Sequence, residues 1–205
     1  MKQQFRAIGD FWRAEYGRYV GMTAAAFLVL LVLAYAAGRL FPDIPVTVIS
    51  AFNEDIAGSG IVQEDGSFNV LALFANNLRA MVLGVLYGFI PFLYLPALAL
   101  GVNAAILGML ASLIDGQWLL LAAGILPHGI FELPALFLSL AAGLCLCKNI
   151  NVYIRKNEKG VMKPLLLNIL RVVALLVLPL LVLPLLVIAA VMETYVTPAL
   201  MQLFL

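Results

Sequence analysis

Residues 127–134 read Pro-His-Gly-Ile-Phe-Glu-Leu-Pro and lie inside an apolar run that extends from Trp118 to Cys147. His128 is the only histidine of the chain, and Glu132 follows it by four residues. Ionisable side chains are costly at membrane depth and are usually paired or functional there. This stretch therefore predicts a polar site inside a membrane, and its two prolines predict a helix that bends or breaks at the site.

The composition indicates an integral membrane protein. Hydrophobic residues make up 64% of the 205-residue chain and charged residues 11%, whereas soluble domains contain roughly 45–50% and about 25%, respectively. The length allows about five spans of roughly 20 residues each, joined by short connections. A large soluble domain does not fit, and the sequence contains neither a nucleic-acid-binding motif nor a nucleotide-binding loop.

The apolar runs predict one all-α membrane domain, residues 1–205, with membrane helices at 19–39, 77–98, 101–114, 118–147 and 165–192. The fourth run is too long to cross straight. Its 30 residues would reach about 45 Å at roughly 1.5 Å per residue, against a hydrocarbon core of about 30 Å. Proline removes a helix hydrogen bond and disfavours helical geometry in the residue before it. We therefore expect the fourth helix to be broken near Pro127 and Gly129, with Pro134 in its main arm.

The basic residues predict the orientation in the membrane. They gather in an arm at residues 1–18 and in a loop at 148–164, whereas the loop at 40–76 contains five acidic residues and no basic one. Basic segments stay in the cytoplasm, and five spans place the arm and the 148–164 loop on that side. The 40–76 loop and the C-terminal tail from Glu193 are then external. We expect a multi-pass protein of the plasma membrane.

Polar residues within the spans define a candidate site, in which Asn77, Arg79 and Asn103 are expected to join His128 and Glu132. The last two share one face of a helix that continues through both. Three interpretations are open from the residues alone. The group is a structural lock between helices, a path for transport of a small solute or ion, or a metal site.

A zinc ion would use His128, Glu132 and Glu193, because imidazole nitrogen and carboxylate oxygen are ligands of zinc. The chain has one histidine and no His-Glu-x-x-His motif, which disfavours a zinc enzyme. A histidine-based catalytic triad is also disfavoured. We therefore expect no catalytic residues, no enzyme activity and no cofactor, with a bound zinc ion as the alternative.

Small residues indicate where helices pack closely. Gly84 and Gly88 form a GxxxG pattern, and Gly108 continues the small-residue spacing in the next predicted span. Such patterns let backbones approach, either within one chain or across a homodimer. Cys145 and Cys147 are two residues apart and point to different helix faces, so we expect two free thiols.

The segment from Leu126 to Ala135 closely resembles the signature of the stage II sporulation protein M family, which comprises multispan bacterial and archaeal membrane proteins. The similarity extends over about residues 76–198. Further positions that agree with the family are Asn76-Asn77-Leu78-Arg79, Gly84, Gly88, Asn103, Gly108 and Glu193-Thr194-Tyr195-Val196-Thr197-Pro198.

The resemblance implies a non-enzymatic membrane scaffold or anchor. In endospore formers, the namesake localises peptidoglycan-degrading partners, the stage II sporulation proteins D and P, during engulfment of the forespore. The family also occurs in organisms that form no spores. The expected partners are therefore the lipid bilayer and membrane or envelope proteins such as peptidoglycan hydrolases. The 40–76 loop, with apolar residues between Val46 and Ile56, is the expected partner-facing surface.

Overall fold

A computed structural model describes the chain except for residues 1–9, 11, 64–66, 115, 157–172 and 205. The secondary structure of the described residues is helical, apart from an isolated antiparallel bridge between Val62 and Phe68. Five helical runs are long and apolar enough to cross a membrane, which confirms the predicted all-α class with five spans. They cover Gly17–Leu40, Val70–Phe89, Leu95–Leu113, Trp118–Arg155 and Leu180–Met201.

The helices follow one another with short connections. In chain order they are η1 (Trp12–Tyr16), α2 (Gly17–Leu40), α3 (Asp43–Gly58), α4 (Val70–Leu86), η2 (Tyr87–Phe89), α5 (Leu95–Leu113), α6 (Trp118–Lys156), η3 (Val173–Val182), α8 (Leu183–Val191), η4 (Met192–Val196) and α9 (Thr197–Met201). Here η1, η3 and η4 are π-helical segments and η2 is a 3-10 turn.

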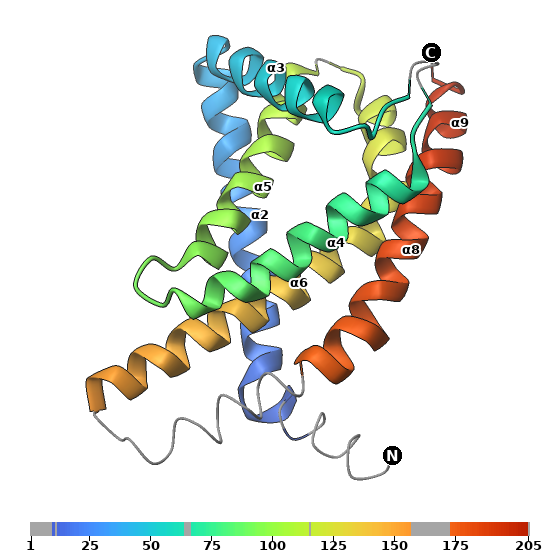
Figure 1. Cartoon of the computed structure of the whole chain (residues 1–205). Helices are drawn as coiled ribbons and strands as arrows, with labels where there is room; N and C mark the ends of the chain where they lie inside the picture. Colours follow the sequence, from blue (N-terminus) through green and yellow to red (C-terminus); the bar gives the residue numbers. More distant parts are fainter. Residues whose placement is uncertain (1–9, 11, 64–66, 115, 157–172, 205) are drawn as a thin grey trace.

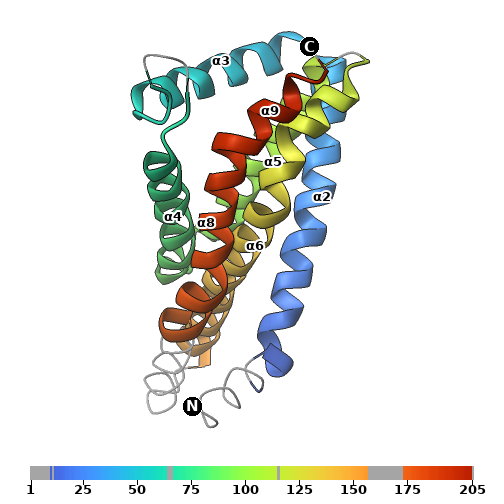
Figure 2. The same cartoon turned by 90° about the vertical axis from the view of Figure 1, so that its right-hand side faces the viewer.

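The central helix of the bundle is α6. Within its most apolar stretch 61% of the residues are buried, compared with 17–28% in the other four spans. α4 and α8 pack along α6, and α2 and α5 form a second pair that also contacts it (Figures 1 and 2). The outer helices leave apolar side chains exposed, as expected of helices that face lipid.

Side-chain contacts join η1 and α2 to α6. The buried Tyr16 hydroxyl, at the end of η1, donates a 2.6 Å hydrogen bond to the backbone carbonyl oxygen of Leu138. Further along, the rings of Phe27 and Phe137 meet edge to face with centroids 5.3 Å apart. An aromatic hydroxyl that is buried in this way is satisfied by a carbonyl group, and it fixes the register of the two helices.

Glycines lie where helices cross. A Cβ atom on Gly88 would meet the carbonyl oxygen of Gly143 and lie 2.8 Å from the Cβ atom of Leu146, both on α6. A Cβ atom on Gly84 would lie 2.9 Å from a methyl group of Leu140. The GxxxG pair, with Gly84 on α4 and Gly88 on η2, therefore lies where this segment crosses α6 within one chain. Gly108 of α5 lies at a similarly close crossing with α2, because a Cβ atom added to Gly108 would meet the backbone of α2.

The predicted break of the fourth span is wrong. α6 is one continuous helix of 39 residues that runs through Pro127 and Pro134. It changes direction in its first turns, at the yellow end in Figure 1. A proline costs a helix one hydrogen bond, whereas a true break would free several backbone groups where no water is available. A bend therefore accommodates the extra length.

Other helix ends also differ from the prediction. The predicted 77–98 span ends at Phe89, α5 begins at Leu95 instead of residue 101, and α6 continues to Lys156 instead of ending at residue 147. α4 begins at Val70, because the Asn69 side chain caps it by accepting hydrogen bonds from the backbone N–H groups of Leu71 (3.0 Å) and Ala72 (3.1 Å). At the other end of the chain, helical structure continues past residue 192 to Met201. Glu193 therefore belongs to the last span and not to an external tail.

The 40–76 segment contains a helix where a loop was predicted. α3 lies across one end of the bundle, transverse to α2 (Figures 1 and 2). Residues 1–9 of the predicted arm, residues 157–164 of the predicted basic loop and residues 165–172 of the predicted fifth span lie outside the described residues. Cys145 and Cys147 are buried free cysteines, as predicted.

The crossing of the GxxxG segment with α6 gives a first prediction. Replacing Gly88 by alanine will destabilise the protein by about 1–3 kcal/mol, because the added methyl group overpacks the contact. Melting in detergent measures the change. Gly101→Ala is the matched control, since a Cβ on Gly101 meets nothing within 4 Å, and its melting temperature should not fall. Equal melting of Gly88→Ala and the control would contradict the close contact.

Candidate intramembrane polar site

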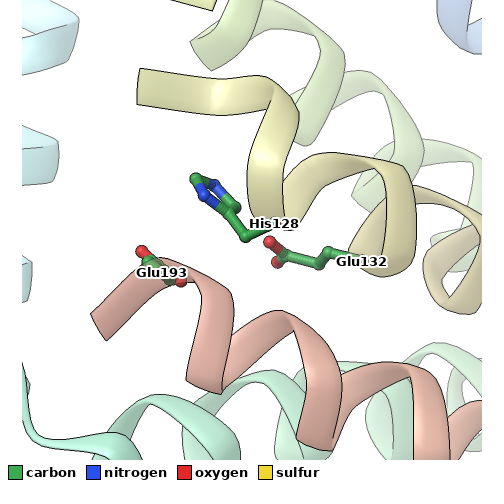
Figure 3. A group of neighbouring side chains, drawn as sticks. All are labelled: His128, Glu132 and Glu193. Atoms are coloured by element: carbon green, nitrogen blue, oxygen red, sulfur yellow. The ribbon is translucent and has the colours of Figure 1, made fainter. Parts of the chain in front are cut away.

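The site is built first from one face of α6. Because the helix is continuous, His128 and Glu132 lie one turn apart and project to the same side. Figure 3 shows both side chains leaving α6 toward the last helical run of the chain. The spacing predicted from the sequence is therefore realised, although the helix is not broken as expected.

Glu193 comes from that facing helix and completes the group. One ligand atom from each of His128, Glu132 and Glu193 can be chosen so that all lie within 4.8 Å of one another. Figure 3 shows the three side chains converging in the space between the two helices. Glu193 lies in the π-helical segment η4, in which the backbone N–H of Thr197 bonds to the carbonyl of Met192 five residues earlier. Such wide turns often occur at functional sites.

The imidazole ring has a partner on the same helical run. His128 Nδ1 lies 3.3 Å from the hydroxyl oxygen of Thr197, which is itself buried. The hydroxyl donates to Nδ1 in one tautomer and accepts from it in the other. Either hydrogen bond fixes the orientation of the ring. Nε2 is then the ring nitrogen that is not bonded to Thr197.

A cavity of about 390 Å³ opens beside the three side chains. It lies between α2, α3, α4, α5, α6 and η4, so α3 forms part of its cover. Among the lining residues that the structure describes, three carry carboxylates and none is lysine or arginine. The polar lining residues are Asp55, Ser59, Asn76, Asn77, Asn103, His128, Glu132 and Glu193.

The structure separates the other predicted site residues. Asn77 is buried and lines the cavity, and Asn103 lines it while its amide donates to the Ala99 carbonyl oxygen (2.9 Å) on its own helix. Arg79 is exposed on α4 and does not line the cavity. Two residues on from Asn77, its side chain points to another helix face.

Sequence reasoning missed four polar residues that contribute to the site. Thr197 contacts His128, and Asp55, Ser59 and Asn76 line the cavity. No spacing rule links residues 55–59 to residue 128, because the two come together only through the path of α3 over the bundle. Asn69 was the available signal for an earlier start of α4, since asparagine before an apolar run is a common helix cap.

The fold and the site define a multispan α-helical membrane protein with an acidic, histidine-containing site inside its bundle. The chain belongs to the family described as stage II sporulation protein M, whose model matches residues 19–198. The chain is 29% identical over 175 residues to an uncharacterized protein of Methanocaldococcus jannaschii, and this similarity covers 83% of the chain and 93% of that protein. No solved structure matches.

The contact of Thr197 with His128 gives a second prediction. Thr197→Val keeps the shape of the side chain but leaves a buried ring nitrogen without its partner, at a cost of about 1–3 kcal/mol. Thermal unfolding in detergent measures this loss. Thr47→Val on α3 is the control, because that hydroxyl is exposed and bonds only within its own helix. A loss no larger than that of the control would show that the contact is not stabilising.

Proposed function

We propose that this protein is a non-enzymatic anchor in the plasma membrane that binds and localises partner envelope proteins, with peptidoglycan hydrolases as the expected class. The observation that carries the proposal is α3, a 16-residue helix that lies across one end of the bundle. Membership of the stage II sporulation protein M family supports it, because the namesake of that family holds peptidoglycan-degrading partners at the membrane.

The distribution of charge supports a cytoplasmic N-terminus and an external α3. Arg13 lies in η1, Arg18 at the start of α2 and Arg155 at the end of α6. Both helix ends are at the same end of the bundle in Figures 1 and 2. α3, with Glu54 and Asp55, is at the opposite end. Positive residues are retained in the cytoplasm, so α3 faces outward in this orientation.

α3 offers a mixed surface for a partner. Ile44 and Val46 are exposed apolar residues of this helix, and Glu54 is an exposed acidic one, whereas the partly exposed Phe52 lines the cavity. Its inner side is held by Pro45, which is buried against Gly38 of α2. Aromatic and aliphatic side chains next to charged groups are typical of protein contact surfaces. A helix in the plane of the membrane surface also suits a protein that recruits partners there.

Transport of a small solute or ion is the second candidate, because a polar cavity at membrane depth favours it. Flux measurements on proteoliposomes separate the two functions. A transporter would lose flux when His128 is replaced by alanine. An anchor would show no flux above empty vesicles and would still recover its partners.

The third prediction concerns the exposed face of α3. Replacing Ile44 and Val46 together by serine will lower recovery of peptidoglycan hydrolases with the tagged protein roughly tenfold, equivalent to about 1.4 kcal/mol of binding free energy. Quantitative mass spectrometry of material purified from the native host measures the recovery of these enzymes.

Leu98→Ser is the control for that experiment. Leu98 is an exposed apolar residue near the start of α5, at the end of the bundle opposite α3 (Figure 1). Its replacement should leave recovery unchanged. If the α3 double variant recovered as much hydrolase as the wild type, with both proteins present in the membrane at equal amounts, the α3 surface would not be the binding site.

A further inference from the structure

We propose that His128, Glu132 and Glu193 bind a divalent transition-metal ion, with zinc as the expected occupant. The ion lies inside the bundle and keeps one coordination position directed toward the cavity beneath α3. This site is separate from the outer surface of α3, so the proposal does not depend on the anchoring function.

The geometry of the three side chains suits one ion. Their nearest potential ligand atoms lie within 4.8 Å of one another. In a tetrahedral zinc site, ligand atoms about 2.0–2.2 Å from the metal are roughly 3.4 Å apart. Small rotations about side-chain bonds would bring the ligand atoms from this separation to the one that zinc needs, because the three side chains already lie around one space (Figure 3).

The charges around the cavity suit a cation. Asp55, Glu132 and Glu193 line it, and no lysine or arginine does so among the lining residues within the described part of the chain. Two ionised carboxylates that approach each other away from water repel strongly. A divalent ion between Glu132 and Glu193 replaces this repulsion by attraction, and it supplies the polar partner that a carboxylate at membrane depth needs.

The hydrogen bond with Thr197 orients His128 as a metal ligand. Metal-binding imidazoles usually engage a polar group through the other ring nitrogen, which fixes the orientation of the ring. Thr197 has this position at Nδ1 of His128, at 3.3 Å, and leaves Nε2 for the ion. Glu193 and Thr197 lie four residues apart across the π-helical segment η4, so this wide turn presents both groups to α6.

The chemical types of the ligands indicate which metal ions the site would bind. Carboxylates alone suit magnesium or calcium, whereas an imidazole ligand favours zinc and its neighbours in the transition series. Three protein ligands with a fourth position held by water or a substrate are the arrangement of catalytic zinc sites, while structural sites use four protein ligands. Here the fourth position faces the cavity, where the amides of Asn77 and Asn103 line the space. Water or another oxygen-donor ligand would occupy it.

Elemental analysis tests the site and provides the fourth prediction. Wild-type protein purified in detergent, loaded with zinc and desalted, will retain about one ion per chain. His128→Ala, Glu132→Gln and Glu193→Gln will each lose it. Thr197→Val will weaken binding by roughly tenfold, because it removes only the group that orients the ring. Glu54→Gln is the control, since Glu54 is an exposed carboxylate of α3 outside the cavity, and it will retain the ion.

Two results would overturn the proposal. One is wild-type protein that holds no zinc and melts at the same temperature with and without it, since an ion bound only to the folded state must raise the melting temperature. The other is zinc retained equally by the three ligand variants, which would indicate adventitious binding. If a glutamine variant fails to fold, Glu193→Asp keeps a carboxylate and should retain zinc with lower affinity.

Cobalt tests the open position. Cobalt-loaded wild type should show the visible absorption of a four- or five-coordinate ion, and added acetohydroxamate, an oxygen-donor ligand, should change that spectrum. A spectrum that acetohydroxamate does not alter would show a closed site and would overturn the open coordination position.

Discussion

Hydrocarbon offers no hydrogen bonds to an ionisable side chain, so every such group within a bilayer must be covered by protein or by enclosed polar space. His128, Glu132 and Glu193 meet this requirement by facing one another between α6 and η4. The arrangement depends on a central α6 with partners on several sides, and α6 is the most buried span. It also requires the last helical run to pass beside α6 at the depth of His128.

The backbone N–H and carbonyl groups of the spans also need hydrogen-bond partners within the protein. Pro127 and Pro134 lie inside α6, and Pro184 lies in α8, yet α6 and the last run remain helical throughout their described lengths. Where water is absent, a bend or a wider turn loses fewer hydrogen bonds than an interruption. The π-helical segment η4 is such an adjustment, and it has a chemical consequence because Glu193 lies within it.

α3 connects the outer surface to the interior. Its exposed side carries Ile44 and Val46, whereas Phe52, Asp55 and Ser59 line the cavity. A partner that packs on this helix would therefore contact an element that also covers the polar site. Gly38 and Pro45 hold the start of α3 against α2 and α5, which fixes this cover over the open end of the bundle.

The sequence by itself determined the class of protein, five apolar spans and the pairing of His128 with Glu132, because hydropathy and helical periodicity are local properties. It also placed Gly84 and Gly88 among packing residues, although it left open whether the contact was internal. Tertiary structure decided that α6 bends without breaking, since neighbouring helices determine how a proline is accommodated. It also decided that Glu193 faces inward and that Thr197, Asp55 and Ser59 reach the site. These residues are distant from His128 along the chain, and only the packing of α3 and η4 brings them to it.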